Sequence, residues 1–241
     1  MTADGLILLG VGASFGQIVA LNSIDMEIPN KGVIAFVGHN GSGKSTLLDI
    51  LSGFLRPSRG NILDGALKDT IHRSDLIARV ARLHQRLVVP PTLQAGRFLT
   101  VVSRRHSLLS LLSPVSSSTC SYSRDASNDL LRAANLVGSM DVPLGKLSYG
   151  QQRVLSLEAV LATTKPFVAL DEPLAGLHPT VRDSVLRRVQ EEGRARCIII
   201  AEHDLAGALS IADRVVVFRL GAIVADVPSA GITAENLVMR L

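Results

Sequence analysis

A glycine-rich segment at residues 38–45 has the pattern of a phosphate-binding loop. It reads GHNGSGKS, matches G-x-x-x-x-G-K-[ST], and lies between an apolar run at 33–37 and a helical pattern at 44–52. In such a loop backbone N–H groups turn toward the phosphate, Lys44 neutralises β- and γ-phosphate oxygens, and Ser45 can bind Mg²⁺. The alternative is a glycine turn that has no ligand. The strand before it and the helix after it favour the phosphate site.

Two adjacent carboxylates follow a second apolar run. Residues 167–173 read FVALDEP, so a buried strand delivers Asp171 and Glu172 to its carboxyl end, where parallel sheets bind ligands. We expect Asp171 to support hydrated Mg²⁺ and Glu172 to orient or deprotonate an attacking water. That role suits hydrolysis better than transfer to a bulky acceptor. The alternative is that one or both carboxylates only cap the next turn.

A third segment resembles a second anion site. The sequence LSYGQQR at 147–153 begins a helical run, so Ser148 and Gly150 are expected at a helix N-terminus, which attracts anions. Because the phosphate loop already has its own helix, we interpret this helix start as a contact to the nucleotide of another copy. A serine that only caps the helix is the alternative.

Two single residues at strand ends are further candidates. His203 follows the apolar run 197–201 and is expected at the same sheet edge as Asp171, where it would contact a γ-phosphate. The alternative is a surface or core histidine whose ring nitrogens are hydrogen-bonded for structural reasons only. Gln85 follows a possible strand at 77–83, and a glutamine at a strand end carries little information by itself.

The elements that position these residues alternate between strands and helices. Short apolar runs typical of strands buried on both faces occur at 33–37, 167–170, 197–201 and 214–218. The segment 178–193 is a predicted helix, with Pro179 in its first turn and Gly193 as its stop. We therefore predict an α/β fold with a mostly parallel sheet. Residues 6–9 and 24–28 are predicted to form an antiparallel hairpin at its edge.

The middle of the chain differs from this core. We interpret the chain as one domain, with a nucleotide-binding core at 1–85 and 147–241 and a helical insert at 86–146. Within the insert, serine is concentrated at 103–127. A disordered loop over 113–128 is the alternative there.

Composition excludes several classes of protein. Of 241 residues, 47% are hydrophobic and 19% charged, which excludes intrinsic disorder. The net charge of +4 comes without a block of like charges, so no nucleic-acid tail is indicated. Cys120 and Cys197 lie far apart, which supports neither a disulfide framework nor a zinc site. No apolar run is long enough to span a membrane, and no secretion signal is recognisable, so a cytosolic chain is expected.

These motifs, in this order, resemble the nucleotide-binding subunit of ATP-binding cassette (ABC) transporters over nearly the whole chain. The segment LSYGQ separates this family from other phosphate-loop proteins. The resemblance assigns the following motif residues: Walker A is Gly38, His39, Asn40, Gly41, Ser42, Gly43, Lys44, Ser45 and Thr46; the Q-loop is Gln85; the signature includes Ser148, Gly150 and Gln151; Walker B is Asp171 and Glu172; and the switch histidine is His203.

The resemblance also implies roles and cofactors. ATP and Mg²⁺ are the expected cofactors. The implied catalytic residues are Glu172, His203, Gln85 and Lys44, and the implied magnesium-binding residues are Ser45, Gln85 and Asp171. Phe15, in ASFG, is similar to the aromatic residue that stacks on adenine, with a core or turn phenylalanine as the alternative.

The family further implies an assembly. Two cassettes, identical or similar, bind head to tail around two ATP molecules, so each nucleotide meets Lys44 of one copy and Ser148 with Gly150 of the other. The Q-loop region and the insert 86–146 would dock onto integral membrane permease subunits. A substrate-binding protein is a further expected partner, and nucleic acid is not. The chain is then expected at the cytoplasmic side of the inner membrane, bound peripherally.

The motifs most resemble the cassettes of branched-chain and other hydrophobic amino-acid importers. Tyr149 stands where the signature commonly has a second glycine, and AGLHP at 175–179 has His178 where those importers commonly have asparagine. Despite these two departures, the resemblance of LSYGQQR at 147–153 and DEPLAGLHP at 171–179 to those cassettes implies import of branched-chain or other amino acids. The alternatives are an exporter cassette, a cassette ATPase acting on DNA or ribosomes, a phosphate-loop kinase, and a regulatory cassette without hydrolysis.

Overall fold

A computed structural model describes residues 5–103, 125–203 and 205–230. Contacts divide the chain into two compact units. The first unit comprises Met1–Arg82, Lys165–Glu172 and Val189–Leu241, and the second comprises Leu83–Thr164 and Pro173–Arg188. The predicted boundaries of the insert, 86–146, remain a prediction, and the serine-rich segment lies largely outside the described residues.

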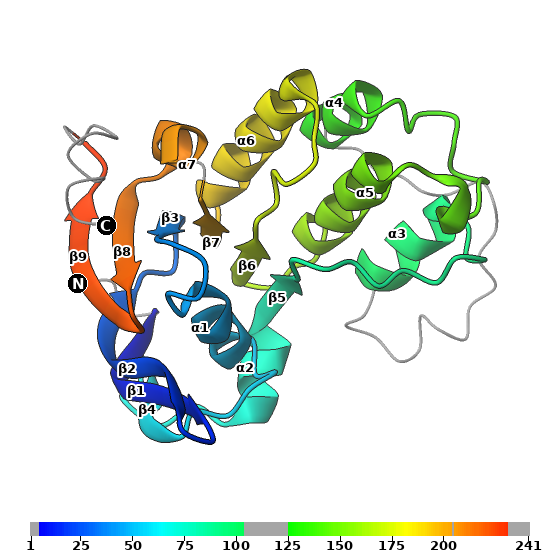
Figure 1. The fold of residues 1–241 in the computed structure, drawn as a ribbon. Helices are drawn as coiled ribbons and strands as arrows, with labels where there is room; N and C mark the ends of the chain where they lie inside the picture. The colour runs from blue at the N-terminus through cyan, green and yellow to red at the C-terminus, as the bar shows by residue number, and fades with distance from the viewer. Residues whose placement is uncertain (1–4, 104–124, 204, 231–241) are drawn as a thin grey trace. The chain divides into compact units, whose positions relative to one another are not determined.

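A six-stranded sheet forms the centre of the first unit (Figure 1). Its strands, in spatial order, are β5 (Val80–Leu83), β6 (Phe167–Asp171), β7 (Cys197–Glu202), β3 (Gly32–Val37), β8 (Arg214–Arg219) and β9 (Ala222–Pro228). The pairs β6–β7, β7–β3 and β3–β8 are parallel, and β9 is antiparallel to β8. This confirms the mostly parallel sheet. Parallel strands that end at one edge bring the loops after β3, β6 and β7 close together.

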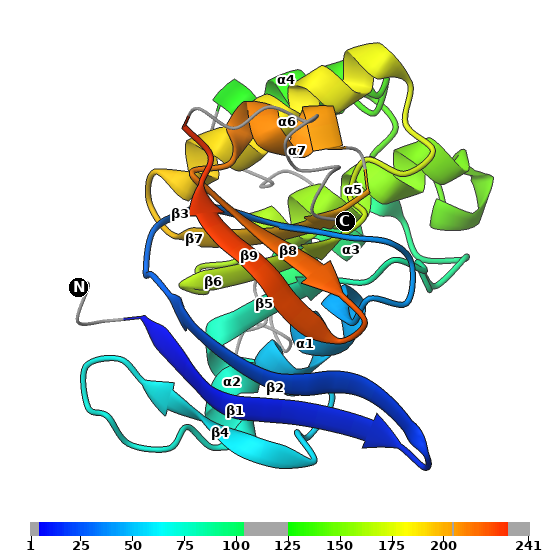
Figure 2. The ribbon, with the colours of Figure 1, turned by 60° about the vertical axis from the view of Figure 1, so that its left-hand side comes forward.

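The amino-terminal strands form a separate antiparallel sheet (Figure 2). Its order is β2 (Ile18–Ile28), β1 (Leu6–Phe15) and β4 (Arg59–Asp64). The predicted hairpin is present, but its strands are longer than predicted and β4 adds a third one. Register shifts between Leu8 and Val11, around Gly10 at φ 59°, interrupt the two-residue alternation that reveals a strand in a sequence.

Helices cover the sheets of the first unit. These helices are α1 (Lys44–Leu51), α2 (Arg73–Arg79) and α7 (Leu205–Ile211). The end of α6 (Pro179–Gly193), from Val189 onward, also belongs to this unit. The α1 helix contacts both β6 and β2, and its leucines share one buried core with both sheets. The possible strand at 77–83 is wrong in its first half, because 73–79 are helical and only 80–83 are extended.

The second unit is helical. Its helices are α3 (Ala95–Ser103), α4 (Asp125–Ala133), the 3₁₀ turn Leu144–Lys146, α5 (Tyr149–Leu161) and most of α6 (Pro179–Gly193). Both α3 and α4 pack against α5, whose residues from Arg153 to Leu161 are all buried. The predicted helices after Ser148 and at 178–193 are thus present. Among the described residues, no helix has the length and apolar character needed to cross a membrane.

Candidate functional site

The phosphate-loop segment joins β3 to α1 in the first unit. Gly38 has φ 151°, and a Cβ there would lie 2.3 Å from the backbone oxygen of Phe218 on β8. Gly43 has φ 105°, and a Cβ there would lie 2.6 Å from the Leu21 side chain. Both positions therefore require glycine, because the loop turns tightly against β2 and β8.

Lys44 lies inside this loop. Its Nζ donates to the backbone oxygens of Gly38 at 2.6 Å and His39 at 3.0 Å, and to Ser42 Oγ at 3.3 Å. Burial lowers the pKa of the Lys44 amine, while the nearby carboxylates of Asp171, Glu172 and Glu202 oppose that shift. The loop thus holds its cation beside the backbone where a phosphate would bind.

Ser45 and Asp171 meet directly, although they are 126 positions apart in the sequence. Ser45 Oγ donates to Asp171 Oδ1 at 3.1 Å, with Ser45 exposed and Asp171 buried. Hydroxyl and carboxylate oxygens are ligands that suit Mg²⁺, which keeps several waters and phosphate oxygens rather than a full protein cage. The described residues contain no group of three or more His, Cys, Asp or Glu that could hold a metal by themselves. The pair therefore fits a magnesium ion that arrives with a nucleotide.

Glu172 turns the chain immediately after β6. Its φ of 47° lies in the left-handed region, which costs a non-glycine residue about 1–2 kcal/mol, and its N–H donates to the Ala201 oxygen at 2.8 Å. Glu172 Oε1 lies 3.9 Å from His203 Nδ1. The two adjacent carboxylates thus have different partners: Asp171 meets the phosphate-loop helix, whereas Glu172 faces the end of β7.

Sequence reasoning missed one residue of this cluster. Arg82, on β5, donates from Nη2 to Asp171 Oδ2 at 2.8 Å and to Asp49 Oδ1 at 3.0 Å. The signal that could have found it is a charged residue inside the buried run VARL at 80–83.

In the second unit, Ser148 is the N-cap of α5. Its Oγ accepts from the Gln151 N–H at 3.2 Å, and its own N–H donates to Gln151 Oε1 at 3.0 Å, which makes a capping box. Gln151 Nε2 also donates to the Ala134 oxygen at 3.2 Å. Ser148 therefore caps the helix, which was the structural alternative for this residue. Its contact with the nucleotide of a second copy remains a prediction.

A second missed residue lies on the same helix. Arg153 has no exposed surface, and its Nη1 donates to the backbone oxygens of His84 at 2.8 Å and Gln85 at 2.9 Å. The Gln85 side chain itself is exposed. The helix that begins at the signature therefore holds the Q-loop backbone within the second unit.

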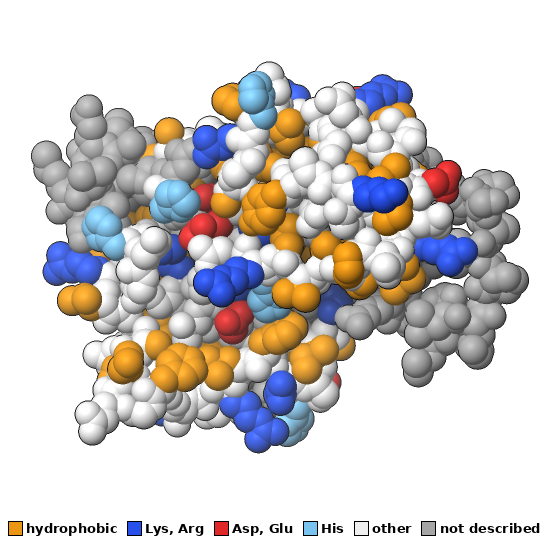
Figure 3. Space-filling view, turned by 45° about the vertical axis from the view of Figure 1, so that its right-hand side comes forward, with side chains coloured by type: hydrophobic (Ala, Val, Ile, Leu, Met, Phe, Trp, Pro, Cys, Tyr) orange, Lys and Arg blue, Asp and Glu red, His pale blue; other side chains and the backbone are white. Residues whose placement is uncertain are grey.

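The described contacts bring together five of the predicted residues, which are Lys44, Ser45, Asp171, Glu172 and His203. For Phe15, Gln85, Ser148 and Gly150, proximity to this cluster remains a prediction. Phe15 is 52% exposed at the end of β1, beside exposed Ile18 and Val19. On the face shown in Figure 3, hydrophobic side chains lie among charged ones.

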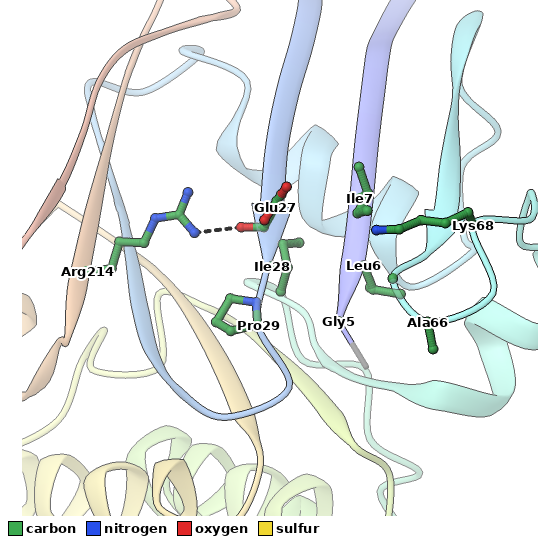
Figure 4. Close-up of a pocket in the computed structure, with 10 residues that line it drawn as sticks. Gly5, Leu6, Ile7, Glu27, Ile28, Pro29, Ala66, Lys68 and Arg214 are labelled. Atoms are coloured by element: carbon green, nitrogen blue, oxygen red, sulfur yellow. Dashed lines mark hydrogen bonds between the residues drawn. The ribbon is translucent and has the colours of Figure 1, made fainter. Parts of the chain in front are cut away.

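A cavity of about 530 Å³ also lies in the first unit (Figure 4). Leu6, Ile28 and Lys68 line it, together with Arg214, whose Nη1 donates to the Glu27 oxygen at 2.5 Å. Its lining contains none of the predicted site residues. Cys197 on β7 is fully buried, and burial raises the pKa of its thiol to about 12. Cys120 lies outside the described residues.

Comparison with known proteins agrees with this geometry. Residues 21–175 match the family model described as ABC transporter. The chain is 30% identical over 237 residues to the high-affinity branched-chain amino acid transport ATP-binding protein BraF of Pseudomonas aeruginosa, covering 94% of this chain and 92% of BraF.

A second relative is longer than this chain. The ribose import ATP-binding protein RbsA of Chelativorans sp. strain BNC1 is 30% identical over 240 residues, covering 98% of this chain and 45% of RbsA. The chain thus spans about half the length of several curated relatives that it matches.

A solved structure shares the fold. It is the dimeric, post-hydrolysis ATP-binding cassette MJ0796 bound to ADP and phosphate, with a TM-score of 0.74, 20% identity, and coverage of 94% of this chain and 100% of that one. Together with the family match over residues 21–175, these similarities establish that the chain belongs to the ABC transporter family and is an ATP-binding ATPase cassette.

Proposed function

We propose that this chain is the ATPase subunit of an ABC importer, in which ATP binding and hydrolysis drive a membrane-spanning partner between conformations. The observation that carries the proposal is the cluster at the carboxyl edge of the parallel sheet. There the phosphate-loop lysine, the Ser45–Asp171 pair and the Glu172–His203 pair come from three neighbouring strand ends.

Each residue of the cluster has a role in this proposal. The N–H groups of 38–45 and the Lys44 amine bind the phosphates. Ser45 and Asp171 hold Mg²⁺, which when bound neutralises charge on the phosphate oxygens. Glu172 accepts a proton from the attacking water, and His203, 3.9 Å away, contacts the γ-phosphate. Gln85 is proposed to reach the same metal and water from the Q-loop.

The active form is proposed to be a head-to-tail dimer. Ser148 and Gly150 of one copy would contact the nucleotide bound at Lys44 of the other. Their place at the amino end of the 13-residue α5 supports this, because a helix N-terminus favours anions. The partner cassette is identical or similar. Phe15, exposed at the end of β1, is proposed to stack on adenine.

The relatives support proposals for the remaining partners and the solute. We propose docking onto integral membrane permease subunits through the Q-loop region and residues 86–146, with a substrate-binding protein delivering the solute. The chain would then be bound peripherally at the cytoplasmic side of the inner membrane. Branched-chain or other amino acids are the favoured solute, because the chain covers nearly all of BraF, whereas it covers half of the ribose protein.

The test of the proposed dimer is the solution mass of Glu172→Gln protein, measured by light scattering with ATP and then with ADP. A dimer with ATP alone supports the shared site. A monomer in both conditions, with ATP bound, contradicts a dimer formed by this chain alone. For the solute, deletion of the gene should abolish uptake of labelled leucine and leave ribose uptake unchanged; the reverse pattern would exclude amino-acid import.

A further inference from the structure

Arg82 joins the two elements that carry Ser45 and Asp171, two of the proposed magnesium-binding residues. It lies on β5, next to β6, and its guanidinium contacts both Asp171 at the end of β6 and Asp49 on α1. The α1 helix begins at Lys44 and continues through Ser45. A single side chain thus connects the phosphate-loop helix to the strand that ends in Asp171.

The Arg82–Asp171 pair is almost completely buried. The Arg82 side chain is 3% exposed and that of Asp171 is 4% exposed, with 2.8 Å between Nη2 and Oδ2. Burying an ion pair carries a large desolvation cost, so such a pair is weak evidence for a gain in stability. A planar guanidinium with several N–H donors in fixed directions does, however, restrict the orientation of a carboxylate strongly.

The two oxygens of Asp171 have separate partners. Oδ1 accepts from Ser45 at 3.1 Å, and Oδ2 accepts from Arg82 at 2.8 Å. The terminal torsion of an aspartate is broad and permits rotation of the carboxylate. The Arg82 hydrogen bond opposes that rotation, and Asp49 braces the guanidinium by accepting from Nε at 3.2 Å and Nη2 at 3.0 Å.

We propose that Arg82 is a positioning residue that keeps Oδ1 of Asp171 beside Ser45, where these two residues would hold a nucleotide-bound magnesium ion. The inference rests on the proposed function of the Ser45–Asp171 pair. It predicts that loss of the guanidinium geometry weakens metal binding more than it weakens nucleotide binding.

Charge and geometry make opposite predictions for this residue. A guanidinium repels a cation, so if its charge dominated, a neutral replacement would strengthen metal binding. If orientation dominates, metal binding weakens even when the charge is kept. Arg82→Lys keeps the positive charge but replaces the planar guanidinium by a single ammonium group. The variant therefore isolates the effect of guanidinium geometry on metal binding.

The experiment measures Mn²⁺ binding, by electron paramagnetic resonance, to protein saturated with a non-hydrolysable ATP analogue. Arg82→Lys should bind Mn²⁺ about 10-fold more weakly than the wild type, the lower end of the loss seen when a residue behind a metal ligand is changed. Affinity for the fluorescent analogue in EDTA should change less than about twofold, because the proposed effect of Arg82 is exerted through Asp171 and Asp49, which lie outside the phosphate loop at 38–45.

A matched control uses Arg79, three residues earlier. It pairs with Asp64 at 2.5 Å, its side chain is 29% exposed, and it touches neither Ser45 nor Asp171 in the described contacts. Arg79→Lys should leave the Mn²⁺ affinity unchanged. Equal losses in the two variants would overturn the inference in favour of a general effect of losing an arginine.

A second variant, Asp49→Asn, tests the inference if Arg82→Lys does not fold. The Asp49 side chain is 35% exposed, so Asp49→Asn should fold, and it removes the charge that braces Arg82. We expect about threefold weaker Mn²⁺ binding. If the wild type binds Mn²⁺ in the presence of the analogue, and Arg82→Lys and Asp49→Asn bind it with the same affinity, the proposed role of Arg82 is wrong. If the wild type shows no analogue-dependent Mn²⁺ binding, the proposed magnesium site itself is wrong.

Discussion

Each compact unit buries an arginine on an element next to a functional motif, but the two arginines have different partners. In the first unit Arg82 binds two carboxylates, one of which belongs to the proposed magnesium site. In the second unit Arg153 binds the backbone oxygens of His84 and Gln85. The first contact is proposed to orient a magnesium ligand, whereas the second fixes the backbone of a loop.

This difference predicts different consequences of mutation. Changes around Arg82 should appear in metal binding, because the carboxylate that it contacts belongs to the proposed magnesium site. Changes around Arg153 should appear first in the stability of the second unit, because backbone oxygens that lose their donor must be hydrated or remain unsatisfied. The predictions below test this contrast, beginning with the largest expected effect.

Replacement of the proposed base should give the largest change. Glu172→Gln should bind ATP with near-normal affinity and hydrolyse it at least ~10²-fold more slowly, as expected when general-base assistance is lost. Fluorescent-nucleotide titration and phosphate release measure the two quantities. Near-normal turnover would show that Glu172 is not the base, and the proposed mechanism of ATP hydrolysis in the first unit would be wrong.

The phosphate loop gives the next test. Lys44→Ala removes the amine that lies among the backbone oxygens of Gly38 and His39, and ATP binding should fall by at least about 100-fold, a loss of roughly 2.7 kcal/mol. Isothermal titration with ATP measures this. Arg79→Lys serves as the control, and unchanged affinity in Lys44→Ala would show that this loop is not the nucleotide site.

The buried ion pair between α5 and α6 tests the second unit. Arg188 and Glu158 have side chains that are 3% and 0% exposed, with Nε and Oε2 3.3 Å apart. Glu158→Gln leaves Arg188 a buried charge without that carboxylate, and should lower the free energy of unfolding by about 3 kcal/mol. The exposed pair Arg132–Asp129 is the control, since Asp129→Asn should have no measurable effect in urea unfolding. Equal effects would mean that burial is not the cause.

Arg153 itself should have a smaller effect on stability. Arg153→Met keeps much of the volume, loses two charge-assisted hydrogen bonds, and should lower the free energy of unfolding by about 2 kcal/mol. Mn²⁺ affinity should fall less than in Arg82→Lys, because Arg153 contacts only the backbone of the proposed ligand Gln85. A 10-fold loss of Mn²⁺ affinity here would remove the contrast between the two arginines.

The smallest expected effect concerns acid stability. The Leu67 N–H, and then Arg79, hold the pKa of Asp64 below its usual value. A carboxylate with a lowered pKa in the folded state stabilises the protein above its unfolded pKa, and this contribution is lost as the pH falls through the folded pKa. Asp64→Asn should therefore reduce the loss of stability on acidification below about pH 4, measured by thermal unfolding at several pH values. A steeper acid loss in the variant would contradict this assignment.

Much of the site could be predicted from short stretches of sequence. The pattern GHNGSGKS, the apolar runs before Asp171 and His203, and the Ser148 cap each depend on neighbours within a few residues. Because carboxyl ends of parallel strands share one edge, those runs also predicted that His203 and Asp171 would lie at the same edge of the sheet. The structure adds the individual contacts at this edge, Ser45 with Asp171 and Glu172 with His203.

Other features could not be predicted in this way. Three strands form a separate amino-terminal sheet although only one hairpin was expected, since bulges near Gly10 interrupt the alternation. The segment 77–79 is helical despite a strand-like composition, because tertiary packing overrides weak local preference. The left-handed backbone of Glu172 depends on its hydrogen bond to Ala201 of the neighbouring strand.

The sequence by itself therefore determined the phosphate loop, the family motifs and the strand ends that carry the reacting groups, because all of these are encoded in residue types at short spacing. Only the tertiary structure decided what surrounds them. Arg82 lies 89 positions from Asp171, and Arg153 lies 68 positions from Gln85. Sheet order and helix packing determine which of these residues meet, because their hydrogen bonds and buried contacts join segments that are far apart in the chain.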